Sequence, residues 1–475
     1  MAVAELSFDE PARALKRVTD VSALFTVLRF GLDPIGEMGR IRARHGALTE
    51  FSFYQSGKTR RYVLAVGSRY NKRVLSDPAT FQSVGIMLPG PRQSAQRRIS
   101  RGLLGPPGPN HAHYRRMMLA PLRRAAVDRM AAKISHIVEQ EASGWPQGAP
   151  IDLFGLCKSV TQRAAVESLF PNGSGGFGQE VLDAVKLIDE HLEMAASPVA
   201  SALQLNIPGL PYHRMVRHAE AVETALVAWA RKWSKPARDD DLMCLLANNP
   251  DEAGASPGET AVLNHLPSLF GAAYETCQTA LVWALFLLAQ HPNAAARLHE
   301  ELQALPDDGP EHLLECAWLD GIVRESMRML PSVPTQTRRA NRNADLVDCD
   351  VEAGAYVVLS AFLTNREPDV FPEPARFRPE RWASLDLNQY EYLAFRAGPR
   401  TCIGNSFAAN FLRIAVGQIV RRYRLEVVAN ARIDHKVRVM LKPGRGGIPV
   451  IVHPQDGRPT ASPIKGSIRD IVEFQ

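Results

Sequence analysis

The chain has 475 residues, of which 45% are hydrophobic and 22% charged, and its formal net charge is +6. This composition is close to the globular average and excludes wholesale disorder, while basic residues scattered in pairs give little support to nucleic-acid binding. The six cysteines include no Cys-x-x-Cys pair, so neither a disulfide scaffold nor a zinc ribbon is expected.

We expect neither an export signal nor a membrane anchor in the N-terminal region. Its best apolar stretch, Val21 to Leu28, is too short to span a bilayer. The longest apolar segment, Ala280 to Ala289, adjoins a helical pattern that contains Glu275, which favours a buried core helix. We therefore expect a soluble, cytoplasmic protein.

Helical periodicity dominates residues 110–330. Only short β-branched or aromatic runs predict strands, at 62–64, 356–359 and 449–452. No internal repeat or low-complexity linker divides the chain. The sequence predicts a mainly α fold with small β-sheets, in which residues 1–454 form one unit. Residues 455–475 form a C-terminal tail that either docks on the body or remains mobile.

One long helix is predicted from a capping pattern at residues 256–259 to about Gln290, where a His-Pro pair ends it. Its expected length is roughly 50 Å, enough to cross a whole domain. Pro267 and Gly271 lie inside it and should kink or loosen its middle. This distortion precedes Glu275 and Thr276 by one turn.

Cys402 lies in the segment Phe-Arg-Ala-Gly-Pro-Arg-Thr-Cys-Ile-Gly at residues 395–404, just before an apolar helical pattern. Exposed amide N–H groups and the positive end of a helix stabilise a thiolate, the form needed for metal ligation or nucleophilic attack. A cysteine in this place is by itself more often a packing residue. Gly398 and Gly404 on either side indicate a backbone that approaches something closely.

This segment resembles the haem-binding loop of the cytochrome P450 family, whose pattern Phe-x-x-Gly-x-Arg-x-Cys-x-Gly is met at every fixed position. The resemblance spans roughly residues 15–453. It implies the family's mainly helical thiolate-haem fold, a single unit that encloses one haem b, with Cys402 as the axial ligand of the iron. A thiolate ligand donates electron density to the iron and favours cleavage of the O–O bond.

Glu325 and Arg328 are three positions apart, so they can pair on one helical face. Taken alone, the pair would be a surface salt bridge of little value. The segment 377–382, Phe-Arg-Pro-Glu-Arg-Trp, resembles the family's meander motif. The resemblance implies a structural charge triad of Glu325, Arg328 and Arg381 that fixes the loop holding Cys402.

The segment Ala-Ala-Tyr-Glu-Thr at residues 272–276 resembles the family's oxygen-activating signature, with Ala273 in place of the usual glycine. Taken alone, Thr276 would bond back to its own helix, and Glu275 would be a paired or solvated carboxylate. The resemblance implies that both are catalytic. Thr276 would position dioxygen or a water, and Glu275 would help to deliver protons.

His111 and Arg115 follow a Gly-Pro-Pro-Gly turn at 105–108 and resemble the family's His-x-x-x-Arg segment, which binds haem propionates. Their spacing places both on one helical face, and the planar fork of arginine suits a carboxylate. A solvent-facing basic helix is the alternative. The resemblance also implies propionate contacts for Arg400 and for Arg338, which precedes a predicted strand; Arg339 is a close competitor.

The chain departs from the family pattern at several positions, and none of these removes a residue essential to the chemistry. Arg396 stands where the family usually has a small residue, which could alter the loop or add positive charge. Phe411 takes the place of a common glutamate, and Asn365 stands where many members have histidine.

The reaction implied is monooxygenation, in which one atom of O2 enters a small, largely apolar organic substrate. No flavin or iron–sulfur domain is visible, so electrons would come from NAD(P)H through a reductase and an acidic ferredoxin or flavodoxin. A basic face containing Arg115, Arg116, Arg396 and Arg400 would steer that partner. Substrate contacts are expected in the segments 82–104, 191–212, 270–276 and 332–337. We expect a monomer.

Two alternatives remain open. The first is a haem-thiolate enzyme of another reaction type, such as a peroxygenase, an isomerase or an oxidative coupling enzyme; the intact Glu275–Thr276 pair argues against it. The second is a catalytically silent homologue that activates a partner enzyme. Loss of the cysteine ligand would be expected there, and Cys402 is present.

Overall fold

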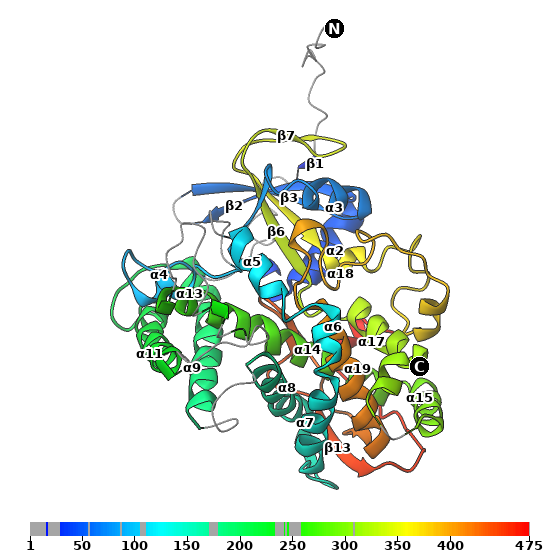
Figure 1. The fold of residues 1–475 in the computed structure, drawn as a ribbon. Coiled ribbons are helices and arrows are strands. Elements are labelled where there is room, and N and C mark those ends of the chain that lie inside the picture. Colours follow the sequence, from blue (N-terminus) through cyan, green and yellow to red (C-terminus); the bar gives the residue numbers. More distant parts are fainter. Residues whose placement is uncertain are drawn as a thin grey trace, which may run out of the picture.

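The computed structural model describes residues 16–17, 29–55, 58–85, 88–104, 111–170, 179–232, 242, 245–246, 258–306 and 309–474. The predicted helix cap at 256–257 and the turn at 105–108 lie outside these ranges. The fold is mainly helical with small sheets, as predicted, and the six-stranded sheet lies at one end of the helical body (Figure 1).

The six-stranded sheet joins segments from both halves of the chain. Its order is β1-β2-β3-β9-β6-β4, and the predicted strands at 62–64 and 356–359 lie in its centre as the parallel pair β3 and β9. The bounds are β1 Lys16–Arg17, β2 Leu48–Gln55, β3 Lys58–Ala65, β4 Phe81–Ser83, β6 Thr335–Ala340 and β9 Tyr356–Ser360. Helices α2 (Pro34–His45) and α3 (Ser68–Leu75) lie beside it.

The remaining helices are α4 Ala95–Ile99, α5 His111–Leu119, α6 Arg124–Asp128, α7 Ala131–Ser143, α8 Leu153–Leu169, α9 Gln179–Ala195, α10 Pro198–Ala202, α11 Pro211–Lys232, α13 Gly258–Phe270, α14 Thr276–Gln290, α15 Pro292–Ala304, α16 Glu311–Glu315, α17 Ala317–Met329, α18 Ala361–Thr364 and α19 Asn405–Arg422. Helix α14 lies in the middle of the molecule and packs against α8, α15, α17 and α19 (Figure 1).

The predicted long helix runs without a break from α13 through the π-helical turn η1 (Gly271–Glu275) into α14. The expected distortion is therefore present, one turn after Pro267, and it takes the form of a π-bulge, a feature frequent at functional sites. The segment Ala261–Gln290 is long and apolar enough to cross a membrane, but 83% of its apolar window is buried inside the protein. It is the core helix that the sequence predicted.

The C-terminal part of the chain forms a second sheet and then packs on the body. β10 (Tyr423–Val427), β13 (Pro449–Pro454) and β5 (Pro150–Asp152) pair in the order β10-β13-β5. Two short hairpins are β7 (Ala344–Asp345) with β8 (Asp350–Val351), and β11 (His435–Val437) with β12 (Leu441–Pro443). After β13, the side chains of Ile464, Ile468 and Val472 are buried, so residues 455–474 dock on the body.

Candidate active site

The loop that presents Cys402 is held by its own backbone. The Cys402 N–H donates to the Phe395 carbonyl at 2.9 Å, and the Thr401 N–H donates to Gly398 O at 2.9 Å. Gly398 has φ +70°, and a Cβ there would come within 2.4 Å of Leu75 O. The close backbone approach indicated by the glycine is thus an approach to the end of α3, and it sets the position of the loop.

The Cys402 side chain is accessible and yet desolvated. Of the five cysteines in the described ranges, all are free thiols, and Cys402 alone is exposed. Burial nevertheless raises the pKa of the Cys402 thiol, against a lowering effect from the Gly404 N–H and the charges of Arg396 and Arg115. The thiol is thus open to contact by a ligand although protein atoms surround it closely.

The charge of Cys402 acts on the middle of the long helix. Burial and the charge of Cys402 together raise the pKa of Cys277 to about 12. Cys277 directly follows Thr276, so the thiol of Cys402 lies near enough to the end of the π-bulge to act on it electrostatically.

Arginines from three separate elements converge beside Cys402. Arg115 in α5 donates to Thr401 O at 2.5 Å, and Arg400 contacts the ring Nε2 of His111. Arg338 is 4% exposed, and burial together with the charges of Arg396 and Arg400 lowers its pKa to about 10. Arg338 lies within β6, not before a strand as predicted. Strand alternation buries Arg338 and exposes Arg339, so Arg338 is the one of the two that lies on the buried side of β6.

These cations have no protein counter-ion within the described ranges. None of Arg115, Arg338, Arg396 and Arg400 forms an ion pair with a carboxylate there, and Arg338 donates only to Thr337 O and to Gln336 Oε1. Burying several like charges without an anion is unfavourable. The donor set therefore fits a ligand that brings carboxylates to the arginines and a metal to the thiol, and haem brings both.

The acid–alcohol pair makes one contact within its own helix and one with a distant strand. The Thr276 hydroxyl donates to Ala272 O at 2.7 Å. Glu275 Oε1 lies 3.1 Å from Lys442 Nζ in β12. Burial raises the pKa of Glu275, and the charge of Lys442 opposes this rise. The geometry thus places an alcohol and a buried, lysine-bound carboxyl next to each other at the bulge.

Two polar partners of the bulge were not predicted from the sequence. Lys442 lies 167 residues from Glu275 in the chain. Tyr274 donates its hydroxyl to Asp189 Oδ1 at 2.6 Å, and Asp189 also pairs with Lys158. Tyr274 lies inside the 272–276 motif, and this was the one local sign in the sequence of a polar group at the bulge. Asp189, Lys158 and Lys442 lie in no motif.

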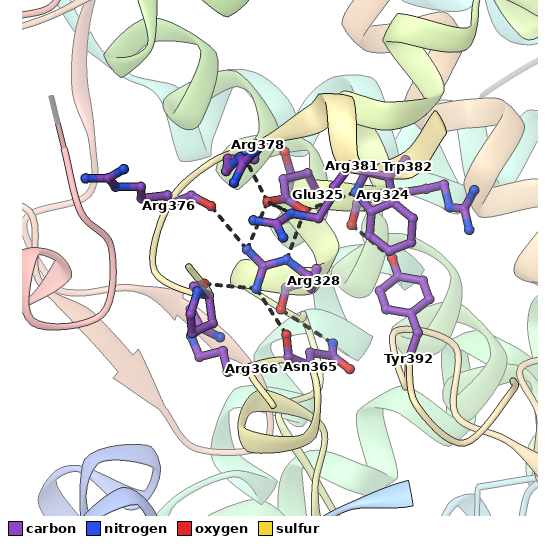
Figure 2. Close-up of polar contacts among 12 residues, drawn as sticks. Arg324, Glu325, Arg328, Asn365, Arg366, Arg376, Arg378, Arg381, Trp382 and Tyr392 are labelled. Carbon is purple, nitrogen blue, oxygen red and sulfur yellow. Dashed lines mark hydrogen bonds and ion pairs between the residues drawn. The ribbon is translucent and has the colours of Figure 1, made fainter. Parts of the chain in front are cut away.

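The implied charge triad is present and buried (Figure 2). Arg328 Nε lies 2.9 Å from Glu325 Oε2, and Arg381 Nε lies 3.1 Å from Glu325 Oε1. The indole of Trp382 donates to Glu325 Oε2 at 3.0 Å. Glu325 and Arg328 are both 0% exposed, so this is a satisfied buried network and not the surface salt bridge of the alternative interpretation.

Asn365 connects this triad to the segment before the cysteine loop. Arg328 donates to the Asn365 carbonyl at 3.0 Å, and the Asn365 side-chain oxygen accepts the N–H of Leu393 at 2.9 Å. Leu393 precedes Phe395, whose carbonyl binds Cys402. The asparagine that departs from the family pattern is thus part of the support of the loop.

The comparisons with known proteins agree with this geometry. The family model "Cytochrome P450" matches residues 33–450. Pentalenene oxygenase of Streptomyces avermitilis is 26% identical over 387 residues, 78% of this chain and 85% of the relative. Cyclooctatin synthase of Streptomyces melanosporofaciens is 25% identical over 365 residues, 74% of this chain and 79% of the relative.

Among solved structures, a retinoic acid-bound cyanobacterial CYP120A1 matches with a TM-score of 0.78 at 17% identity. The match covers 94% of this chain and 100% of that chain, and it shows a shared fold. The chain therefore belongs to the cytochrome P450 family, whose members carry haem iron, and it is a P450 monooxygenase.

Proposed function

We propose that this enzyme inserts one atom of O2 into a small, largely apolar organic molecule, with electrons from NAD(P)H delivered by a reductase and a ferredoxin or flavodoxin. The observation that carries the proposal is the presence of three features in one region of the molecule. These are the Cys402 thiol, the acid–alcohol pair of the π-bulge, and a group of desolvated arginines that have no carboxylate partner within the described ranges.

In this proposal, haem b is the resident cofactor, and when bound it supplies the iron centre at which O2 is activated. Cys402 is the axial ligand. His111, Arg115, Arg338 and Arg400 hold the two propionates, which would relieve the mutual repulsion of the arginines. Binding of a metal cation by the sulfur would offset the burial that raises the pKa of the Cys402 thiol, so that the thiolate is the bound form.

In this proposal, Thr276 and Glu275 take part in proton transfer. The Thr276 hydroxyl donates to Ala272 O, so its own oxygen keeps lone pairs that can accept a hydrogen bond from a water. Glu275 is buried, and burial raises its pKa toward the range in which a carboxyl both gains and loses a proton near neutrality. Lys442 holds the carboxylate at the bulge until the proton is taken up or released.

The electron partner would dock on the face made by α5 and α6. Of the four arginines expected to steer it, Arg116 is exposed, whereas Arg115, Arg396 and Arg400 are partly buried around the cysteine loop. Arg123 and Arg124 are also exposed and extend the basic face. An acidic ferredoxin or flavodoxin complements such a surface and would associate faster at low salt.

An apolar substrate is supported by the side chains of the segments expected to contact it. Leu88, Met194 and Tyr212 come from two such segments, 82–104 and 191–212, and pack together with Met215 and Val216. One relative is named as an oxygenase of pentalenene. Both observations favour a small organic molecule bound mainly by burial of its apolar surface.

The test is the reduced carbon monoxide difference spectrum of the purified protein. We expect the red-shifted Soret band of a thiolate-ligated haem, its loss in Cys402→Ala, and its retention in Cys349→Ala, which removes a buried thiol elsewhere. Absence of the band in the wild type, or its persistence in Cys402→Ala, would defeat the assignment. A panel of small apolar molecules, screened for a low-spin to high-spin shift, then identifies the substrate class.

A further inference from the structure

Arg396 has a backbone conformation that L-residues disfavour. Its φ is +62°, in the left-handed region, and among the described residues it shares a positive φ with only four other non-glycine residues. The Arg396 N–H donates to Leu393 O at 3.0 Å, which makes the turn that leads into the cysteine loop. Glycine would adopt this conformation with less strain, so arginine at this position destabilises the folded loop relative to glycine.

The Arg396 side chain extends into the group of cations beside Cys402. Its charge acts on the Cys402 thiol, on Arg338 and on Arg400, lowering the pKa of each. Burial lowers the pKa of the Arg396 guanidinium itself. The guanidinium makes no hydrogen bond or ion pair with any residue that the structure describes, whereas Arg115, Arg338 and Arg400 each make a polar contact with the protein.

A strained backbone together with a desolvated and unpartnered cation is the pattern expected of a residue that binds a ligand. The backbone conformation positions the guanidinium, and the missing partner is an anion. The charged neighbours Arg338 and Arg400 repel this side chain, whereas the charge of Cys402 acts in the opposite sense.

We propose that Arg396 is an additional anion-binding residue of the haem site, whose guanidinium donates hydrogen bonds to a carboxylate of the bound haem. The inference rests on the proposed haem site and adds a cation to the four residues already assigned there. The extra positive charge beside the sulfur also favours the reduced state of the iron, because reduction adds a negative charge to the site.

Three substitutions separate the charge from the strained backbone. Arg396→Gln removes the charge and keeps a side chain in the left-handed conformation. Arg396→Gly removes the charge and relieves the strain. Arg396→Lys keeps the charge without the planar fork. Arg44→Gln is the control, because Arg44 is an exposed arginine of α2 and its loss changes the net charge equally.

The first measurement is the rate at which each holoenzyme loses haem to excess apomyoglobin. We expect release roughly tenfold faster in both Arg396→Gln and Arg396→Gly, as for loss of one charge-assisted hydrogen bond, and a rate within a few-fold of wild type in Arg396→Lys and Arg44→Gln. The second measurement is the reduction potential of the iron, which should fall in the Gln and Gly variants and stay unchanged in the other two.

The outcomes are distinct. Wild-type haem retention and potential in both Arg396→Gln and Arg396→Gly would overturn the inference, while a normal wild-type carbon monoxide band would leave the haem site itself intact. A defect in Arg396→Gln that is absent from Arg396→Gly would assign the effect to the backbone turn and would also overturn it. Failure of the wild type to bind haem would instead refute the proposed function.

Discussion

Glu275 and Lys442 form an ion pair with 3.1 Å between Oε1 and Nζ, although they lie 167 residues apart in the chain. The strand that carries Lys442 is held against the long helix. The Trp283 indole of α14 donates a hydrogen bond to Leu441 O of β12 at 2.7 Å. The β11–β12 hairpin therefore presents a cation to the carboxyl of the bulge, and this contact opposes the rise in the Glu275 pKa that burial causes.

Replacing Lys442 by methionine should raise the pKa of Glu275 further, since Lys442 is the main group that lowers it against burial. A carboxyl whose folded pKa is raised destabilises the protein as pH rises through that pKa. Lys442→Met should therefore lower the free energy of unfolding by about 1–2 kcal/mol at pH 8 and by less at pH 5, because protonation of Glu275 at lower pH reduces the contribution of the ion pair. Urea unfolding at the two pH values measures this difference.

The control is Lys436→Met, which removes the same charge from the residue paired with Lys442 across the hairpin. The alkaline limb of the pH profile of NAD(P)H-driven O2 consumption should move only in Lys442→Met. An equal shift in both variants would mean that general charge, and not the contact with Glu275, controls the profile.

The buried triad should respond far more strongly to substitution than the exposed charges next to it. Glu325→Gln leaves Arg328 without its anion at a fully buried position, so we expect a loss of about 3–5 kcal/mol in unfolding free energy and poor haem retention. Glu373→Gln is the control, because Glu373 pairs with Arg376 and Arg378 at exposed positions, where less than about 1 kcal/mol is expected. Similar losses in the two variants would contradict the structural role of the triad.

The parts of the site that could be predicted are those encoded within a few residues. Cys402 and its flanking glycines, the Glu325–Arg328 spacing and the distortion near Gly271 are local patterns, and the structure contains each of them. The choice between Arg338 and Arg339 required the strand register, because neighbouring side chains in a strand face opposite sides.

The contacts made by Lys442 and Asp189 depend on how distant elements pack, so no spacing along the chain announces them. Asn365 differs from these two residues, because the sequence already identified it as a departure from the family pattern. The structure gives it partners on both sides, at Arg328 and Leu393.

Thr276→Ala tests the proposed role of the hydroxyl. The hydroxyl now donates to Ala272 O, a contact that the helix backbone can lose at little cost, so stability should change by less than about 1 kcal/mol. Electron use should separate from product formation, with release of hydrogen peroxide. Thr276→Ser keeps the hydroxyl and should remain better coupled. The measurement is the ratio of peroxide formed to NAD(P)H consumed, in the presence of a substrate found by the spin-shift screen. Tight coupling in Thr276→Ala would count against the proposed role of the Thr276 hydroxyl.

The two glycines around Cys402 should differ sharply when replaced by alanine. At Gly398, φ is +70° and a Cβ would lie 2.4 Å from Leu75 O, a backbone atom that cannot move away cheaply. At Gly404, the cap of α19, φ is −93° and the nearest atom to a Cβ is Cys402 Sγ at 4.0 Å, an ordinary contact. Gly398→Ala should therefore displace the loop from α3, costing about 2 kcal/mol or more and weakening the thiolate-type carbon monoxide band. Gly404→Ala should retain both the band and the stability. The reverse order would show that the approach of the loop to Leu75 does not position the thiol.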